Sequence, residues 1–170
     1  LRFAGYDVST EYYINDAGTQ IENLGKSIYY AGRHLFFGAP YELPQDCYKG
    51  EYVLLLAQQA KDSLGLEVFE NLSQIAILSC FGKDKMLEEI KANLAQVGIV
   101  FDNYVSEKEL FTAWDSTLRT LKANNGVYEQ EGKLWLKSSE YGDEKDRVIV
   151  RESGEPTYLA GDIIYHRDKF

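Results

Sequence analysis

Hydrophobic and polar positions near the start of the chain predict a strand followed by an amphipathic helix. β-Branched and aromatic residues are frequent from Val8 to Ile14, which is typical of a strand. After the polar residues Asn15 and Asp16, apolar residues recur at alternating steps of four and three: Ala17, Ile21, Leu24, Ile28, Ala31 and Leu35. This spacing gives a helix one apolar face, with Asp16 as its N-cap. Gly18 and Gly25 share this helix, and we expect another element to pack closely against them.

The next part of the chain is predicted to be mostly helical. Glycine, proline and aspartate break any periodicity between Phe37 and Lys49, as in a linker. Helical spacing of apolar residues returns from Glu51 to Ser63 and again from Glu67 to Gln96, with a division expected at Gly82. A helix-rich block therefore follows the first strand and helix.

Strand signals return in the last third of the chain. Ile99 to Val105 is a candidate strand, and Ser106 with Glu109 forms a capping box at the start of a helix. A hairpin is expected around Glu131 and Gly132, between strands at 127–130 and 134–138. Further strands are expected at 147–151 and 157–159, followed by a last helix that begins near Gly161 and Asp162. Strand–helix elements at both ends, with helices between them, predict an α/β fold.

Composition narrows the class of protein. The 170 residues can form one sizeable core or two small ones, and no apolar run approaches the roughly 20 residues of a membrane helix, so no membrane is expected as a partner. The net charge of −9 argues against nonspecific nucleic-acid binding by the chain as a whole, although it leaves room for a local basic patch. Cys47 and Cys80 lack metal-ligand spacing, which favours structural thiols in a reducing cytoplasm.

The common sequence motifs of metal binding, nucleophilic catalysis and nucleotide binding are absent. The two histidines, His34 and His166, do not pair with other ligands at metal spacing, so no metal site is expected. Nucleophile elbows, CxxC pairs, Walker loops and GxGxxG sequences do not occur. The charged run from Glu140 to Arg147 fits either a solvated loop or a hinge where an inserted block rejoins a main sheet.

The segment from Thr157 to Asp162 is a stronger candidate for a binding site than the charged run. A strand would end here, the chain would turn at Gly161, and Asp162 would open a helix. Ligands bind at the ends of strands in open α/β sheets, and Tyr158 and Asp162, four residues apart, would both face such a crevice. The alternative is that Asp162 only caps its helix.

Four stretches resemble the catalytic domain of class I arginyl-tRNA synthetases of bacterial type. They are EYYINDAGTQIENLGKS, YKGEY, VYEQEGKLWLKSSEYGDEKDRVIV and PTYLAGDIIYHRDKF. Within them lie three motifs in the family's order and spacing: Asn-Asp-Ala-Gly-x-Gln from Asn15 to Gln20, Gly-Asp-x-x-Asp-Arg from Gly142 to Arg147, and Thr-Tyr-x-x-x-Asp-Ile from Thr157 to Ile163. Three motifs in register make chance similarity an unsatisfactory explanation.

The resemblance implies a Rossmann-like nucleotide-binding fold interrupted by a helix-rich connective insertion. Residues 1–37 would belong to the first half of that fold, residues 38–146 to the insertion with its short strands, and residues 147–170 to the start of the second half. It also implies an arginine–tRNA ligase of the cytoplasm. Such an enzyme joins L-arginine and ATP, which carries Mg²⁺, into arginyl-adenylate and passes the arginyl group to the 3′ end of tRNA(Arg).

The resemblance implies that two residues of this chain bind the substrate. Tyr158 would pack and hydrogen-bond against the arginine, and Asp162 would bind the guanidinium, whose planar set of donors matches a carboxylate. Asn15, Asp16, Gly18 and Gln20 would shape the rim of the same crevice. No residue is expected to bind a metal.

The family's other motifs set limits on this expectation. The HIGH-type ATP motif would precede Leu1, and the second ATP motif and the anticodon-binding domain would follow Phe170. We therefore expect an interior fragment that is inactive alone and that self-associates through exposed sheet edges. Two alternatives remain: a non-catalytic arginine- or tRNA-binding module derived from the same fold, and a structural α/β domain whose motifs only shape its core.

Overall fold

The computed structural model describes residues 1–170, which form two compact units. Unit 1 consists of Leu1–Thr10 and Asp16–Asn103, and unit 2 consists of Glu11–Asn15 and Tyr104–Phe170. Each unit has its own cluster of buried hydrophobic side chains. The chain contains both helices and sheets, as predicted, while the Rossmann-like arrangement and the division into two catalytic segments and an insertion stay predictions.

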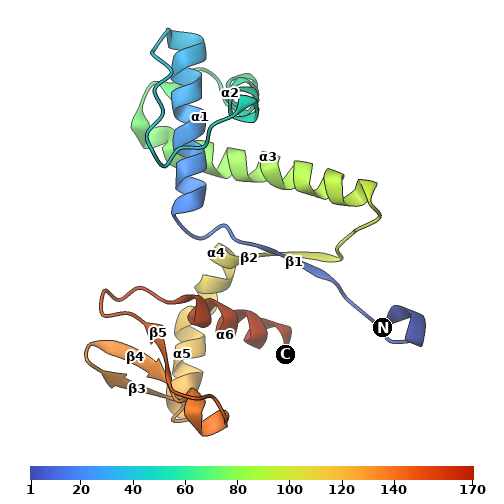
Figure 1. The fold of residues 1–170 in the computed structure, drawn as a ribbon, viewed down its shortest axis with the longest axis vertical. Helices are drawn as coiled ribbons and strands as arrows, with labels where there is room; N and C mark the ends of the chain where they lie inside the picture. The colour runs from blue at the N-terminus through green and yellow to red at the C-terminus, as the bar shows by residue number, and fades with distance from the viewer. The chain divides into compact units, whose positions relative to one another are not determined.

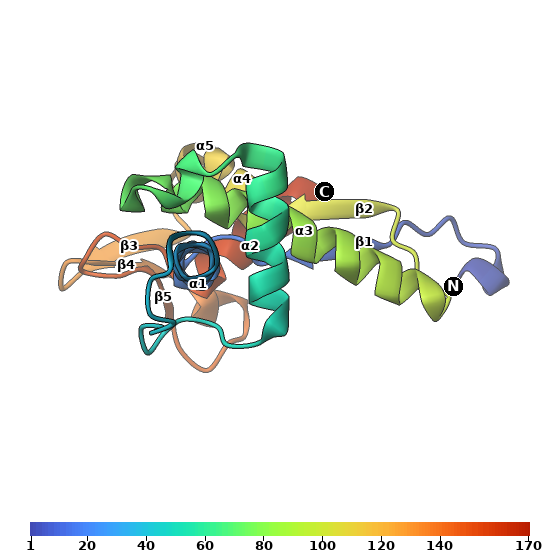
Figure 2. The ribbon, with the colours of Figure 1, turned by 90° about the horizontal axis from the view of Figure 1, so that it is seen from above.

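Unit 1 is built on three helices. They are α1 (Thr19–Phe37), α2 (Glu51–Leu64) and α3 (Ile75–Gln96), and short 3₁₀ turns lie at η1 (Arg2–Ala4), η2 (Glu67–Phe69) and η3 (Leu72–Gln74) (Figure 1). Figure 2 looks nearly along the axis of α1 and shows α2 and α3 running across it. Ile28, Val53, Phe69 and Leu78 are fully buried among them. Of the apolar face predicted for α1, Leu24, Ile28 and Ala31 belong to this core, whereas Leu35 is 44% exposed and Ala17 precedes the helix.

Glycines allow α1 and α3 to approach closely. A Cβ atom at Gly25 would lie 2.7 Å from the carbonyl oxygen of Ile75 and 2.8 Å from the backbone nitrogen of Ser79. This confirms the close packing predicted at Gly25. The division predicted at Gly82 is wrong, because α3 continues through Gly82, where side chains of α1 occupy the space that a Cβ atom would need.

Gly18, not Asp16, is the N-cap of α1. Its backbone lies at φ 133° and ψ −177°, a region that in practice only glycine occupies. No heavy atom lies within 4 Å of the position of a Cβ atom at Gly18. The predicted close packing against Gly18 is therefore wrong, and the backbone conformation explains the residue.

Unit 2 contains two small sheets. Strands β1 (Glu11–Ile14) and β2 (Asn103–Ser106) pair with each other, whereas β3 (Val127–Gln130), β4 (Lys133–Leu136) and β5 (Arg147–Val150) form an antiparallel sheet. Its helices are α4 (Glu107–Leu110), η4 (Phe111–Ala113), α5 (Trp114–Ala123), η5 (Ser138–Tyr141) and α6 (Tyr158–Lys169). Leu134, Ile149 and Ala160 form the buried centre of this unit.

Two local predictions in unit 2 are confirmed. The Ser106 hydroxyl accepts a hydrogen bond of 3.1 Å from the backbone nitrogen of Glu109, which makes Ser106 the N-cap, as predicted. Glu131 and Gly132 both have positive φ, 53° and 69°, which is the geometry of the tight turn that joins β3 to β4.

The strand predicted at 157–159 is wrong. α6 begins at Tyr158, and Thr157 stands at its N-cap in an extended conformation. The Thr157 hydroxyl donates to the carbonyl oxygen of Val148 over 2.9 Å, and its backbone nitrogen donates to Ile149 over 2.9 Å. These bonds to β5 fix the point at which the chain leaves the sheet and turns into the helix. Asp162 consequently lies inside α6 and does not cap it.

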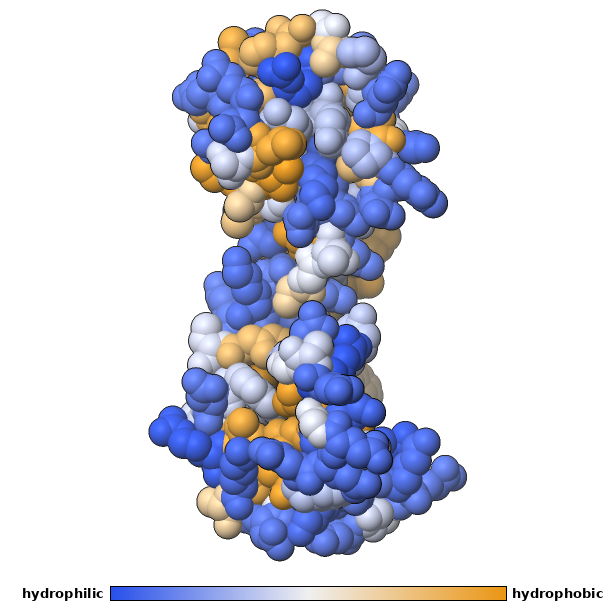
Figure 3. Space-filling model, turned by 90° about the vertical axis from the view of Figure 1, so that its left-hand side faces the viewer, coloured by the Kyte–Doolittle hydropathy of each residue, from blue (hydrophilic) through white to orange (hydrophobic).

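The surface is mixed in character. On the face drawn in Figure 3, hydrophobic side chains form small groups among hydrophilic ones. None of the helices combines the length and the apolar character that a membrane crossing requires.

Candidate functional site

The two residues predicted to bind substrate lie on one face of α6. Tyr158 is the first residue of the helix and is 79% exposed, and Asp162 follows one turn later and is also exposed. Residues four apart on a helix are neighbours on its surface. The structure therefore brings the pair together on the surface of unit 2, with both polar ends open to solvent.

The same face of α6 continues to Tyr165 and Lys169, at further steps of three and four residues. The Tyr165 hydroxyl donates a hydrogen bond of 2.6 Å to Glu11 Oε2 on β1. Lys169 Nζ lies 3.8 Å from the same carboxylate oxygen and 3.9 Å from the centre of the Tyr165 ring. The Tyr13 ring lies 5.0 Å from that of Tyr165. We call Glu11, Tyr13, Tyr165 and Lys169 the β1–α6 cluster.

Burial and hydrogen bonding both act on the cluster's phenol. Partial burial raises the pKa of the Tyr165 hydroxyl, and the hydrogen bond to the Glu11 carboxylate raises that pKa further. The hydroxyl therefore keeps its proton at neutral pH and acts as a stable donor to Glu11. Glu11 accepts the hydrogen bond of the Tyr165 hydroxyl and lies near the Lys169 ammonium group, so its negative charge is compensated without a ligand.

Sequence reasoning missed the β1–α6 cluster. Tyr165 and Lys169 continue the helical spacing of Tyr158 and Asp162, which is a signal that the sequence contains. Glu11 lies 154 residues from Tyr165 along the chain, and no local pattern connects the two. Only the packing of β1 beside α6 shows that they belong together.

The residues of the Asn15–Gln20 motif fall on different units. Asn15 is exposed at the end of the β1 segment in unit 2, whereas Asp16, Gly18 and Gln20 belong to unit 1. The Asp16 side chain is only 4% exposed, and Lys83 Nζ of α3 lies 3.7 Å from its Oδ2. Asp16 thus pairs with a helix of unit 1, while Gly18 and Gln20 are exposed. Their assignment to the rim of a substrate site stays a prediction.

The Gly142–Arg147 motif forms a loop held by its own side chains. Arg147 contacts Asp143 twice, through Nε at 2.7 Å and Nη2 at 2.6 Å. Asp146 accepts hydrogen bonds from the Ser139 nitrogen at 3.0 Å, the Ser139 hydroxyl at 2.6 Å and the Tyr128 hydroxyl at 3.0 Å. The Arg147 guanidinium lowers the pKa of Asp143, and the hydrogen bonds from Ser139 lower the pKa of Asp146. Both carboxylates therefore serve the shape of the loop.

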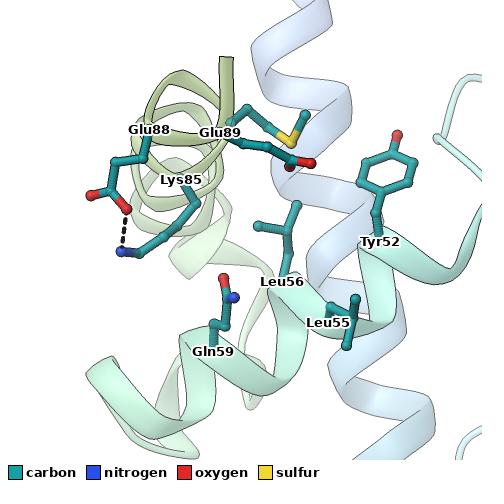
Figure 4. Close-up of a pocket in the computed structure, with 8 residues that line it drawn as sticks. Tyr52, Leu55, Leu56, Gln59, Lys85, Glu88 and Glu89 are labelled. Atoms are coloured by element: carbon teal, nitrogen blue, oxygen red, sulfur yellow. Dashed lines mark hydrogen bonds and ion pairs between the residues drawn. The ribbon is translucent and has the colours of Figure 1, made fainter. Parts of the chain in front are cut away.

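A cavity of about 430 Å³ lies between α2 and α3 in unit 1 (Figure 4). Its walls combine apolar and charged side chains from the two helices: Tyr52, Leu55, Leu56, Gln59, Lys85, Met86, Glu88 and Glu89. Lys85 Nζ donates to Glu88 Oε2 over 2.7 Å at its edge. The cavity contains none of the residues predicted to bind substrate. No group of three or more side chains in the chain is arranged to hold a metal ion.

The chain is similar to proteins of known sequence and structure. No family model matches the chain. It is 56% identical over 169 residues to the arginine–tRNA ligase of Wolinella succinogenes, a match that covers 99% of this chain and 32% of that protein. A solved structure from Campylobacter jejuni, named an arginyl-tRNA synthetase, matches with a TM-score of 0.88 and 50% identity, covering 99% of this chain and 37% of that one.

A more distant solved structure shares the fold. The arginyl-tRNA synthetase of Thermus thermophilus matches with a TM-score of 0.56 at 23% identity, over 97% of this chain and 29% of that one. The chain spans about a third of the length of the curated relatives that it matches.

Proposed function

We infer that this chain is a segment of an arginine–tRNA ligase, since it matches such enzymes over 98% to 99% of its length at 50% identity or more. We propose that the full-length protein activates L-arginine with ATP to arginyl-adenylate and transfers the arginyl group to the 3′ end of tRNA(Arg) in the cytoplasm. The observation that carries the arginine assignment is the exposed pairing of Tyr158 and Asp162 on one face of α6.

We propose further that β1 belongs to a Rossmann-like sheet, that residues 38–146 are inserted into this fold, and that β2, which lies within the insertion, extends the sheet. Two observations support this. β1 leads through the Asn15–Gly18 corner into α1, as a strand leads into a helix in such folds. Figure 1 draws β1 and β2 running in the same direction, as neighbouring strands of a parallel sheet do.

Arginine recognition follows from the chemistry of the two side chains. A guanidinium presents its donors in one plane, and a carboxylate accepts two of them side by side, which an ammonium group cannot match. Asp162 supplies that carboxylate, and the Tyr158 ring supplies a flat face against which the cation stacks, a contact worth about 0.5 to 2 kcal/mol. Excluding lysine then depends on leaving Asp162 poorly paired when the wrong side chain enters.

The reaction needs no nucleophile from this chain. The carboxylate of arginine attacks the α-phosphorus of ATP, the bond to the β-phosphate breaks and pyrophosphate leaves, so the protein's task is to position the reactants and stabilise charge. ATP brings Mg²⁺ with it, and we assign none of the chain's residues to the ion.

The test is the Asp162→Asn variant of the full-length protein, measured by arginine-dependent exchange of pyrophosphate into ATP. We expect the KM for arginine to rise on the order of 10²-fold, because a neutral amide does not balance the guanidinium charge. The KM for ATP should stay unchanged. Tyr158→Phe, which keeps the ring and removes the hydroxyl, should raise the KM for arginine less.

The matched control is Asp168→Asn. Asp168 is an exposed aspartate of the same helix that lies on a different face, so its loss should leave both KM values unchanged. An arginine KM within twofold of wild type in Asp162→Asn would refute the arginine site. A wild-type protein that binds arginine without catalysing the exchange would instead be the binding module.

A further inference from the structure

We propose that Tyr165 and Glu11 are positioning residues, which set the orientation of α6 so that Asp162 meets the substrate guanidinium. This proposal rests on the proposed function, because it concerns the same arginine site. It assigns a role in substrate recognition to the β1–α6 cluster, whose members do not themselves touch the substrate.

The cluster fixes α6 along the face that carries Asp162. Tyr165 lies one turn after Asp162 on that face, and its hydroxyl is bonded to Glu11 of β1 over 2.6 Å. The ring is held in addition by Tyr13, at 5.0 Å, and by Lys169, at 3.9 Å. A rotation or a slide of the helix would break this short bond, so the bond determines where Asp162 points.

The opposite side of α6 is attached differently. Ala160 and Ile164 are buried in the core of unit 2, and Arg167 Nη1 donates to the hydroxyls of Ser116 at 3.1 Å and Thr117 at 2.9 Å on α5. These contacts join that side of the helix to the core and to α5, and none of them lies on the face that carries Asp162. The Glu11–Tyr165 bond is therefore the contact that ties the exposed, substrate-facing side to a strand.

The negative charge of Glu11 is compensated within the β1–α6 cluster. The Glu11 side chain is 25% exposed and has Lys169 Nζ at 3.8 Å and the Tyr165 hydroxyl at 2.6 Å. Its charge is thus compensated inside the cluster, and it does not compete with Asp162 for the arginine. The pair acts through geometry, and displacements of about 1 Å at a site of this kind are enough to reduce rates by as much as 10²-fold.

The experiment is a double-mutant cycle in the full-length protein, with the KM for arginine and the KM for ATP measured by pyrophosphate exchange. Tyr165→Phe removes only the hydroxyl and should raise the KM for arginine about 3- to 10-fold without changing the KM for ATP. Glu11→Gln keeps an acceptor for the Tyr165 hydroxyl and should have a smaller effect than Glu11→Leu. In the Asp162→Asn background, Tyr165→Phe should add little, because the residue that it positions is already lost.

A control separates positioning from a general loosening of the helix. Arg167→Gln removes two hydrogen bonds from the other side of α6, and we expect it to lower the melting temperature while leaving the KM for arginine within twofold of wild type. An equal rise in the arginine KM for Arg167→Gln and Tyr165→Phe would refute the positioning role. So would a Tyr165→Phe effect of the same size in both backgrounds.

Failure of this proposal is distinguishable from failure of the proposed function. If Asp162→Asn leaves the KM for arginine unchanged, the arginine site is wrong and the positioning role falls with it. If Asp162→Asn raises that KM and Tyr165→Phe does not, the site stands and only the positioning role is refuted.

Discussion

The guanidinium of Arg147 grips the carboxylate of Asp143 at two points, with Nε 2.7 Å from Oδ2 and Nη2 2.6 Å from Oδ1. Both residues belong to the Gly142–Arg147 motif, and the same loop is tied again at Asp146 through Ser139. Sequence reasoning left this segment as either a solvated loop or a hinge. The contacts show a loop with a fixed shape, which leads to a prediction about pH.

The stabilisation from Asp143 should disappear in acid. The Arg147 guanidinium lowers the pKa of Asp143 below its usual 3.8, so the stabilisation is fully present above about that pH and is lost as the pH falls through the lowered pKa of the folded state. The difference in free energy of unfolding between wild type and Asp143→Asn should therefore be constant from about pH 5 to 8. In this range the Asp143 carboxyl is ionised in the unfolded chain as well as in the folded one. It should shrink below about pH 4.

Denaturant unfolding at a series of pH values measures this difference. Glu144→Gln is the matched control, since Glu144 is an exposed neighbour and its replacement should give a small difference that does not change in this way. A wild-type advantage over Asp143→Asn that grows as the pH falls would contradict the assigned contact.

Gly25→Ala should destabilise the protein through the contact between α1 and α3. The new Cβ atom would lie 2.7 Å from the carbonyl oxygen of Ile75 and 2.8 Å from the Ser79 nitrogen, and backbone atoms of a helix cannot move aside. We expect a loss of about 1 to 3 kcal/mol in the free energy of unfolding, even though alanine is the better helix former.

Gly161→Ala in α6 is the control for that substitution. Its Cβ atom would have its closest neighbours at 3.6 and 3.7 Å, which are ordinary contacts, so no loss of stability is expected. Thermal unfolding of the two variants, each in the full-length protein, gives the comparison. Equal melting temperatures would show that α1 and α3 are not packed as described.

Gly18→Asn should be harmful although Gly18 has open space around it. The backbone at φ 133° and ψ −177° is close to forbidden for a residue with a Cβ atom, and we expect a loss of about 1 to 3 kcal/mol. Gly38 at the other end of the same helix lies at φ 68° and ψ 18°, a left-handed conformation that asparagine tolerates. Gly38→Asn should therefore lose less, about 1 kcal/mol or below. Chemical denaturation of both variants tests this order, and a reversed order would contradict it.

Lys83→Met should leave a buried carboxylate short of its cation. The Asp16 side chain is 4% exposed and lies 3.7 Å from Lys83 Nζ, so we expect a loss of about 1 to 3 kcal/mol. Lys85 on the same helix pairs with Glu88, whose side chain is 65% exposed, and Lys85→Met should change stability by about 1 kcal/mol or less. Unfolding curves for the two variants give the comparison. A loss at Lys83 no larger than that at Lys85 would mean that the pair with Asp16 contributes nothing.

The sequence by itself determined the local elements whose signals lie within a few residues. The apolar periodicity of α1, the N-cap at Ser106 and the Glu131–Gly132 turn all correspond to structure, because helix faces, caps and tight turns depend on short-range backbone geometry. The motifs also identified the family to which the chain is similar, as the identity to known arginine–tRNA ligases confirms.

Tertiary structure decided where those elements begin and what their side chains contact. The start of α6 at Tyr158 depends on hydrogen bonds between Thr157 and β5, and the N-cap at Gly18 leaves Asp16 to pair with Lys83 of α3. The bond between Glu11 and Tyr165 joins residues 154 positions apart. Contacts of this kind arise only when separate elements pack, so no local pattern in the chain encodes them. The residues beside the Asp162 face of α6 are therefore set by the tertiary structure.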